Sequence, residues 1–389
     1  YSIEHYDNNT RRNEDGRYVV TLPFRDNIED LGNSRRNALA QLLHQERRLE
    51  RDAKLKQMYD EFINEYINMG HMVECEDSDI QSGYYLPHHA VFKDSTTTKL
   101  RVVFDASRKT SSGLSLNDCM MAGPRIQDEL YNIMLRFRSY EIAFTADVAK
   151  MYRQILVAEE QQNYQRILWR KNKSENIKEY KLTTVTYGTS SAPFVAVNTL
   201  IAIGKQWQDK LPEAAQIIQR DFYMDDCMSC CETLDQAIRL QKDVTQILAE
   251  AGLPLRKWSS NNMDLINAIP LDQREGAQTD GEASISTLGL RWFNLKDEFG
   301  FKMNPFKDVK TVTKRIVLSE ITKMYDPLGL LAPFTVLCKI LMQKLWVANL
   351  DWDSEIPKEI AAEWESYKEE IPILLQYRLK RWIEYKAGA

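Results

Sequence analysis

Short strand-like runs and helical stretches alternate through the middle of the chain, over about residues 83–230. Residues 101–104 (RVVF) and 142–145 (IAFT) are runs of β-prone side chains and predict strands. Residues 185–193 are rich in small side chains and predict a loop, whereas residues 194–207 are apolar enough for a buried helix. This alternation predicts a domain of the α/β or α+β class.

The N-terminal part is polar at first and then helical in pattern. A strand-like run at residues 18–22 is stopped by Pro23, and Ser34 is a suitable N-cap for a long helical pattern that Gly70 would end. The apolar positions that recur at helical spacing in this stretch are Leu55, Tyr59, Phe62 and Tyr66.

The C-terminal part, beyond Pro305, is again helical in pattern. Helices are expected around residues 340–346, 361–367 and 371–385, after a turn at 326–329 (DPLG). We therefore place a boundary near residue 300, between a mixed body and a helical C-terminal part.

Composition removes several classes of protein. The chain has 389 residues, which suggests two to three domains, and its 15 glycines and 12 prolines are too few for a disordered or fibrous chain. No apolar run approaches the ~18 residues of a membrane span, and the polar N-terminus has no secretion signal. Six cysteines favour a reducing compartment. The chain starts at Tyr1 rather than Met, so a segment of a longer polyprotein is expected.

The net charge of −5, from 51 basic and 56 acidic residues, argues at face value against a nucleic-acid partner. The distribution of charge changes this picture, because residues 161–181 and the helical pattern after Ser34 are locally basic. Such patches would meet backbone phosphates in a nucleic-acid cleft, and an ordinary solvated helix surface is the alternative.

The most informative stretch is residues 222–228 (FYMDDCM), where Asp225 and Asp226 stand between hydrophobic, β-prone side chains. A surface hairpin tip is the ordinary explanation, since Asp is common in turns. A tight hairpin turn favours Asn-Gly or Asp-Gly, however, and no glycine is present here. Two adjacent carboxylates repel each other unless a divalent cation binds them.

A second acidic position has the same context. Asp147 follows the strand-like residues 142–146, and a carboxylate at the end of a buried strand is costly unless it is paired or metal-bound. Two strands that end in acids can gather three carboxylates, which suits two Mg²⁺ ions about 4 Å apart in phosphoryl transfer. Mn²⁺ is possible at the same ligands.

Residues 223–226 (YMDD) resemble the Y-x-D-D signature of reverse transcriptases. Further motifs resemble those of the same family and occur in the family's order. They are Lys93-Asp94-Ser95 with residues 99–105 in the fingers, residues 144–147 (FTAD) with Tyr152, Gly188 with residues 192–194 (APF), Gly252-Leu253 with Lys257-Trp258, and Leu288-Gly289-Leu290 with Trp292.

Three further stretches resemble the BEL/Pao class of LTR retrotransposons, namely residues 84–91 (YYLPHHAV), 101–107 (RVVFDAS) and 325–329 (YDPLG). The resemblance runs from about Asp15 to the Trp352-Asp353 region. It implies an α+β right-hand polymerase of fingers, palm with antiparallel sheet, and helical thumb. The implied segments are 1–120 for an N-terminal extension and fingers, 121–154 for the first part of the palm, 155–190 for the second part of the fingers, 191–304 for the palm with the primer grip, and 305–389 for a thumb or connection-like region.

The resemblance also implies the activity, that of an RNA-directed and DNA-directed DNA polymerase. The implied partners are an RNA or DNA template with a primer, which is a tRNA in the cell, and deoxynucleoside triphosphates; no membrane is involved. Its location would be the cytoplasm, in virus-like particles of the parent element. The oligomeric state stays open, and RNase H activity is expected to be absent.

Site roles follow from the resemblance residue by residue. Asp147, Asp225 and Asp226 would hold the two metal ions, although Asp226 alone is also explained as a turn acid. Lys93 and Arg101 would grip the β- and γ-phosphates, and Lys99 is an alternative to Lys93.

Further roles fall on the sugar, the leaving group and the primer. Tyr152 resembles the steric gate against a ribose 2′-OH, or else is a core tyrosine, and Lys257 would be the general acid for pyrophosphate or simply an exposed lysine. Tyr187 stands where many retroviral enzymes have Gln, which implies an altered nucleotide contact or a scaffold role. The remaining assignments are Met224 at the nucleotide, and Tyr223, Leu288, Gly289 and Trp292 at the primer and template.

Other constellations have bland explanations. Cys227, Cys230 and Cys231 lack nearby partners for a zinc site and are expected to be buried in a strand. His88 and His89 have no acid at catalytic spacing and are expected to be structural. Two other classes of function remain open: a domesticated, non-catalytic nucleic-acid-binding protein, and another palm-type nucleotidyl enzyme such as a cyclase.

Overall fold

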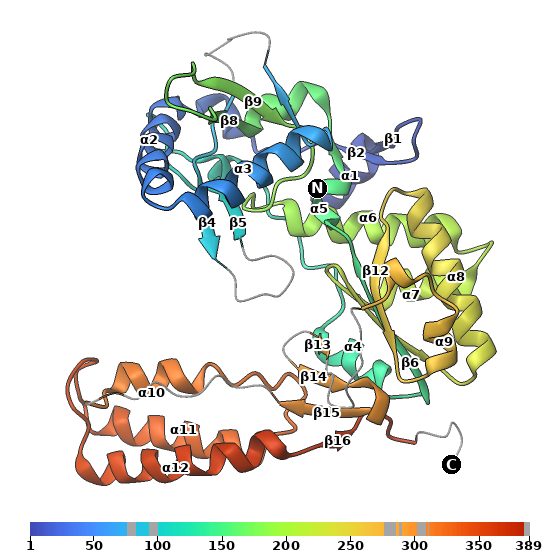
Figure 1. Cartoon of the computed structure of the whole chain (residues 1–389), viewed down its shortest axis with the longest axis vertical. Helices are drawn as coiled ribbons and strands as arrows, with labels where there is room; N and C mark the ends of the chain where they lie inside the picture. The colour runs from blue at the N-terminus through green and yellow to red at the C-terminus, as the bar shows by residue number, and fades with distance from the viewer. Residues whose placement is uncertain are drawn as a thin grey trace. The chain divides into compact units, whose positions relative to one another are not determined.

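The computed structural model describes residues 1–75, 83–92, 100–275, 285–287, 290–301, 309 and 311–384. These residues form two compact units that interleave along the chain (Figure 1). The first unit takes the described residues of 1–127, 148–219 and 244–254, and the second takes 128–147, 220–243 and the described residues from 255 onward. Each unit therefore combines three stretches that are distant in sequence, and the five segments expected from the sequence stay a prediction.

The first unit packs helices against small sheets of short strands. Its sheets have the orders β1-β2-β7, β3-β9-β8 and β4-β5. The helices are α1 (Ser2–Asn9), α2 (Arg35–Arg51), α3 (Ala53–Asn68), α5 (Met151–Gln154), α6 (Ala192–Trp207) and α7 (Pro212–Arg220), whose last residue falls in the second unit. The strands are β1 (Arg11–Arg12), β2 (Tyr18–Val20), β3 (Met72–Glu74), β4 (His88–Phe92), β5 (Leu100–Phe104), β7 (Leu156–Val157), β8 (Arg166–Trp169) and β9 (Lys178–Leu182).

The helical pattern between Ser34 and Gly70 forms two helices rather than one. The chain breaks at Asp52, whose side chain accepts a hydrogen bond from Leu55 N at 2.9 Å and caps α3. Ser34 precedes α2, but its hydroxyl accepts from Tyr85 N at 2.7 Å instead of capping the helix. The expected strands at 18–22 and 101–104 and the buried helix at 194–207 are confirmed.

Strands β4 and β5 form a separate two-stranded ribbon. Ala90 lies opposite Val102 in the antiparallel pairing, and no third strand joins this sheet among the described residues. A two-stranded hairpin is marginal on its own, so side chains from neighbouring elements must hold it. His88 is one such anchor, because its Nε2 donates to Leu168 O at 2.9 Å while its Nδ1 accepts from the Tyr59 hydroxyl. The expectation that His88 is structural is confirmed.

The second unit contains a four-stranded sheet of order β10-β11-β6-β12 and a further sheet of order β13-β14-β15-β16. The strands are β6 (Ile142–Val148), β10 (Phe222–Tyr223), β11 (Asp226–Cys231), β12 (Leu255–Ser260), β13 (Ile285–Thr287), β14 (Leu290–Phe293), β15 (Glu298–Phe301) and β16 (Leu379–Lys380). The helices are α4 (Leu130–Phe137), α9 (Met263–Asn267), α10 (Lys314–Ile321), α11 (Ala332–Val347) and α12 (Lys358–Gln376), and α8 (Leu234–Glu250) is shared between the units. A core of Ile133, Phe137, Met228, Trp292 and Phe299 joins α4 to both sheets.

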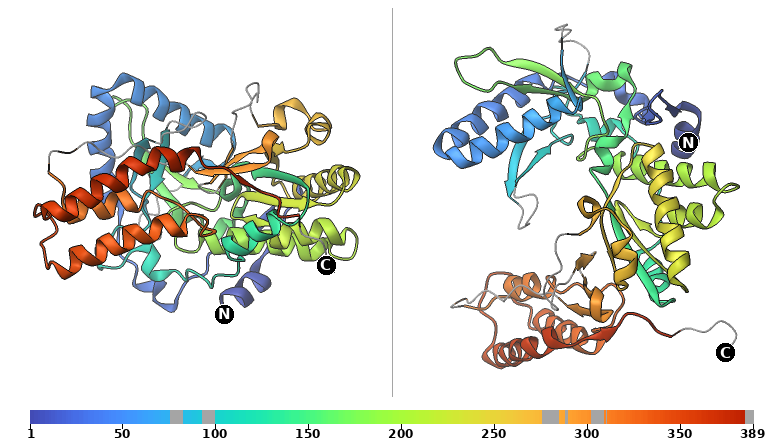
Figure 2. Two further views of the ribbon diagram at one scale, coloured as in Figure 1. Left: turned by 90° about the horizontal axis from the view of Figure 1, so that it is seen from below. Right: turned by 45° about the vertical axis from the view of Figure 1, so that its right-hand side comes forward.

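The C-terminal part is helical, as expected, and α10, α11 and α12 lie side by side in all views (Figures 1 and 2). One expected helix is wrong in extent, because residues 371–376 continue α12 through Pro372 and residues 379–380 form strand β16. The strand is set by its pairing with β15, in which Leu379 lies opposite Phe299.

An aromatic cluster fastens the ends of these helices. The Lys314 ammonium lies 3.3 Å from the ring centre of Trp346 and 5.0 Å from that of Trp352. The two indoles meet edge to face at 5.6 Å, and Lys314 is only 3% exposed. Arg315 N donates to Trp352 O at 3.1 Å, which ties the loop after α11 to the start of α10.

A buried arginine fastens the segment after β16. The Arg381 side chain is fully buried, and its guanidinium bonds Asp297 at 2.7 and 2.8 Å. It also donates to the carbonyls of Phe137 and, at 2.7 Å, Glu141. Among the described residues, no helix has the length and apolar character needed to cross a lipid bilayer.

Candidate active site

The acidic residues of the YMDD stretch and of the preceding strand meet in the sheet of the second unit. Strand β11 pairs antiparallel with β6, and Asp226 lies directly opposite Asp147 in the register. Directly opposed residues project from the same face of a sheet with their Cβ atoms about 4.5–5.5 Å apart. Further along the same face, Met228 lies opposite Thr145 and contributes to the buried core. The packed sheet therefore continues into two half-exposed carboxylates at its end.

The turn between β10 and β11 presents the third carboxylate. Tyr223 pairs with Asp226, so that Met224 and Asp225 form the two-residue connection. Met224 adopts a left-handed φ of 55°, which is unfavourable for a side chain other than Gly, Asn or Asp. A tight hairpin forms here without glycine, and it leaves Asp225 exposed.

Lys257 approaches this group from the other side of β6. It lies on β12, and its Nζ is 3.4 Å from Asp147 Oδ2. Its side chain is 47% exposed and that of Asp147 is 25% exposed, so the pair is accessible to solvent and to a ligand. Lys257 also has a left-handed φ of 55°.

Glu275 is a further acid beside this pair that sequence reasoning missed. Its backbone N donates to Trp258 O at 3.0 Å, next to Lys257 in the chain. Burial raises the pKa of the Glu275 carboxyl, the charge of Lys257 lowers it and that of Asp147 raises it further. No motif in the sequence marks this residue, because it reaches the site only through the backbone contact with β12.

The residues at this site fit a hard divalent cation in their chemistry. Asp147, Asp225 and Asp226 supply carboxylate oxygens, the ligands that Mg²⁺ prefers, and two of these acids oppose each other across one strand pair. Like charges directly opposite destabilise a sheet unless a cation neutralises them. Within the described residues, no three His, Cys, Asp or Glu side chains already converge as a ligand set.

Of the residues expected at the nucleotide, Met224 lies in the β10–β11 turn of the second unit, and the other described ones lie in the first unit. Arg101 is exposed on β5, and Tyr152 is half-buried on α5, five residues after Asp147 in the chain. Tyr187 is half-buried, and its hydroxyl donates to Val102 O at 2.6 Å. Lys93 and its alternative Lys99 lie outside the described residues.

The residues expected at the primer have a mixed outcome. Trp292 is 1% exposed, and its indole N–H donates to Asp297 at 3.0 Å, so its side chain belongs to the core and cannot touch a primer. The short motif around Trp292 does not show whether this side chain faces the core or the outer side of β14. Tyr223 is half-buried beside the same core, whereas Leu288 and Gly289 lie outside the described residues.

Comparisons with known proteins agree with this arrangement. The reverse transcriptase (RNA-dependent DNA polymerase) family matches residues 92–263, which contain all three acids and Lys257. A second family, described as the Pao retrotransposon-like RNaseH-like domain, matches residues 313–388. The two matches together support a reverse transcriptase of the BEL/Pao class of retrotransposons. No curated protein matches the sequence.

A solved structure of a reverse transcriptase has the same fold. The foamy viral protease-reverse transcriptase in complex with double-stranded DNA is 13% identical, with a TM-score of 0.54 over 83% of this chain. The match covers 48% of that chain, so this chain spans about half of its length. The likeness confirms the expected α+β polymerase fold.

The description of the second family mentions an RNaseH-like domain. In this chain the described residues of that region form α10, α11, α12 and the short strand β16. The expectation that RNase H activity is absent is not tested by this arrangement and stays a prediction.

A clamp centred on the buried Asp221 supports the hairpin of β10 and β11. Asp221 precedes β10, and its carboxylate accepts from Arg136 Nε at 3.0 Å and from the Ser229 hydroxyl at 2.8 Å. Arg136 lies on α4 and also bonds Asp128 at 2.6 Å. Both strands of the hairpin are thereby tied to one helix. The charge of Asp221 is visible in the sequence, but its long-range partners are not.

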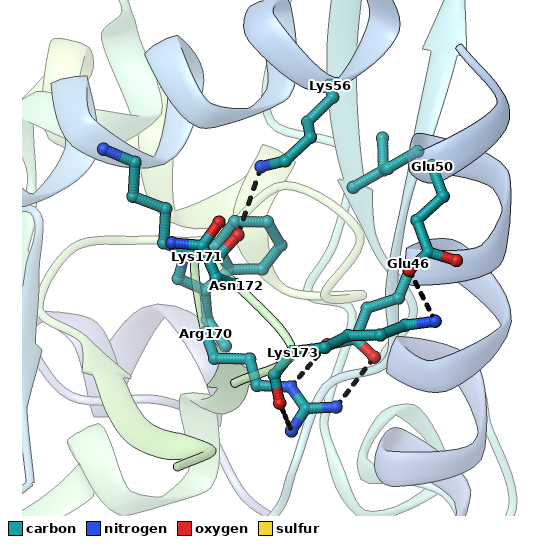
Figure 3. Close-up of a pocket in the computed structure, with 9 residues that line it drawn as sticks. Glu46, Glu50, Lys56, Arg170, Lys171, Asn172 and Lys173 are labelled. Carbon is teal, nitrogen blue, oxygen red and sulfur yellow. Dashed lines mark hydrogen bonds and ion pairs between the residues drawn. The ribbon is translucent and has the colours of Figure 1, made fainter. Parts of the chain in front are cut away.

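The basic stretch at residues 161–181 is largely neutralised within the first unit. Five of its cations lie 2.6–3.9 Å from a carboxylate, namely Arg166, Arg170, Lys173, Lys178 and Lys181. Two of them line a pocket over Trp169, where Arg170 bonds Glu46 and Lys173 bonds Glu50 (Figure 3). Whether this stretch meets backbone phosphates or is solvated surface stays a prediction, but a phosphate would have to compete with these carboxylates.

Proposed function

We propose that the chain adds deoxynucleoside monophosphates to a primer 3′-OH, directed by an RNA or DNA template, with release of pyrophosphate. The observation that carries the proposal is the pairing of Asp226 opposite Asp147, with Asp225 in the adjoining turn. A strand pair that ends in opposed carboxylates is unfavourable as pure structure and suits a cation-assisted phosphoryl transfer.

Two Mg²⁺ ions held by these three acids would lower the pKa of the primer hydroxyl and neutralise the triphosphate. The other roles belong to side chains of the chain itself. Arg101 would bind the triphosphate as a fork of donors, and Tyr152 would exclude a ribose 2′-OH. Lys257, an ammonium 3.4 Å from Asp147, would give its proton to the leaving pyrophosphate.

The partners follow from the same proposal. The substrates are deoxynucleoside triphosphates and a primed template, with a tRNA as primer in the cell. The place of action is the cytoplasm, in particles of the parent element.

Primer extension on an RNA template with Mg²⁺ tests this function. Asp225→Asn keeps the size of the side chain and removes its charge, and we expect incorporation to fall at least about 100-fold. Asp209→Asn is the matched control, because Asp209 is an exposed acid of the first unit, and its rate should stay within about twofold. Equal incorporation by Asp225→Asn and the unchanged chain would sink the proposal. Template binding without incorporation by the unchanged chain would favour the non-catalytic alternative.

A further inference from the structure

The hydroxyl of Tyr187 is used inside the protein. It donates to Val102 O on β5 at 2.6 Å and accepts from the Tyr66 hydroxyl at 3.4 Å. Its ring lies 5.6 Å from the ring of Phe104, also on β5. Burial raises the pKa of the Tyr187 hydroxyl, so it remains a donor at neutral pH. These contacts leave its polar end directed to β5 rather than to a nucleotide.

The backbone next to Tyr187 lies just as close to β5. Gly188 has a left-handed φ of 102°, and a Cβ at this position would stand 2.2 Å from Phe104 O. Only glycine permits this approach. Residues 187 and 188 therefore both contact β5. Tyr187 does so through its hydrogen bond, and Gly188 through a close backbone approach that a side chain would block.

This contact supports an element that has little support of its own. β5 pairs only with β4 among the described strands, and it carries Arg101 immediately before Val102. Arg101 is exposed, and its charge acts on the hydroxyl of Tyr187. A shift of Val102 would move Arg101 with it, because the two residues are neighbours in one strand.

The same network reaches the residue expected at the sugar. The Arg153 guanidinium lies 3.9 Å from the ring centre of Tyr66 and donates to His71 at 2.9 Å and to Glu65 at 3.0 Å. Arg153 follows Tyr152 in the chain. Contacts from Arg153 through Tyr66 to Tyr187 thus connect α5 to β5 within one unit.

We infer that Tyr187 is a positioning residue that holds β5, and with it Arg101, in the place where the triphosphate binds. The inference rests on the proposed polymerase function. It predicts that loss of the Tyr187 hydroxyl weakens nucleotide binding without slowing the chemical step, because the hydroxyl bonds β5 and Tyr66.

Steady-state incorporation with Tyr187→Phe tests this directly. We expect the KM for the deoxynucleoside triphosphate to rise about three- to tenfold while kcat stays within about twofold, as for the loss of one buried hydrogen bond. Arg101→Ala should raise KM as well, and Tyr187→Phe should add less than twofold to it in the double variant, because the tether acts through Arg101. Tyr6→Phe is the matched control, since it removes a buried hydroxyl bonded to Thr199 at 2.8 Å and should leave KM unchanged.

An unchanged KM in Tyr187→Phe, or fully additive effects in the double variant, would overturn the positioning role of Tyr187. A fall in kcat with unchanged KM would also overturn it, in favour of a direct role in the reaction. Amide hydrogen exchange separates this inference from the proposed function. Even if the unchanged chain incorporates no nucleotide, residues 100–104 should exchange faster in Tyr187→Phe and not in Tyr6→Phe, and equal exchange would count against the tether.

Discussion

At the scale of single residues, backbone strain gathers around the acidic site. Lys150, Met224 and Lys257 each have a left-handed φ of 55° without being glycine. Each stands within three residues of an acid of the site in sequence or contacts one: Lys150 follows Asp147, Met224 precedes Asp225, and Lys257 pairs with Asp147. Such conformations cost free energy and persist where surrounding structure enforces them, often at functional sites. The strain here aims the turn and β12 toward the same carboxylates.

His88 offers a residue-scale prediction about pH. Burial lowers the pKa of this imidazole from 6.5 to about 4. Between these pH values the imidazole is therefore protonated in the unfolded chain and neutral in the folded chain. The free energy of unfolding should therefore fall as the pH is lowered through this range, and be fully retained above it. From pH 7 to pH 5 the loss due to His88 is about 2 kcal/mol.

Urea unfolding at both pH values, compared between the unchanged chain and His88→Gln, measures this loss. His71, whose pKa is also lowered to about 4 chiefly by burial, is present in both proteins and cancels in the comparison. The same pH dependence in the two proteins would contradict the prediction.

The site itself was predictable to different degrees at this scale. The three acids were predictable because charge within apolar, β-prone runs is costly and demands an explanation from the sequence alone. Trp292 was misjudged as a primer contact, since its burial depends on packing against α4 and a bond to Asp297. Asp221 and Glu275 were missed because their partners come from distant stretches of chain.

At the scale of elements, the aromatic cluster around Lys314 allows a second prediction. A nearly buried ammonium held against two indoles contributes about 1–2 kcal/mol. Lys314→Met keeps the length of the side chain and removes the charge, so the free energy of unfolding of the second unit should fall by about that amount.

Denaturant unfolding followed by tryptophan fluorescence measures this change, since Trp346 and Trp352 report on the cluster. Lys339→Met is the control, because Lys339 is exposed on α11 and should change stability by less than about 0.5 kcal/mol. An equal effect of the two substitutions would show that the charge of Lys314 is not stabilising.

Elements with a strong local signal were predicted well, and those set by distant contacts were not. The apolar helix α6 and the strands β5 and β6 follow from their own composition. The break at Asp52 depends on a single cap, and β16 depends on pairing with β15 rather than on its two residues. Helical periodicity alone therefore joined α2 to α3 and extended α12 beyond Gln376.

At the scale of the whole molecule, Arg381 closes the second unit. Replacing it with Met would leave the Asp297 carboxylate without its charged partner and the Phe137 carbonyl without this donor, whereas the Glu141 carbonyl would keep its bond from Asn261 at 2.8 Å. Removing one partner of a buried ion pair costs about 3–5 kcal/mol, and we expect a loss of this size in the second unit.

Differential scanning calorimetry should show the unfolding of the second unit at a lower temperature in Arg381→Met, with the first unit unchanged. Lys380→Met, at a neighbouring side chain that is 81% exposed, should leave both transitions in place. An unshifted second transition in Arg381→Met would contradict the prediction.

The buried position of Arg381 also bears on the order of events during synthesis on the ribosome. The first unit ends at residue 254, so all of its chain has been synthesised while later codons are still being read. The second unit gains the bonds from Arg381 to Asp297 and to the Phe137 carbonyl of α4 only after residue 381 has been synthesised. Residues 128–147, which include Asp147, are therefore synthesised early, whereas their contacts with Arg381 form late. Translation thus separates Asp147 from the buried arginine that completes the second unit by more than 200 codons.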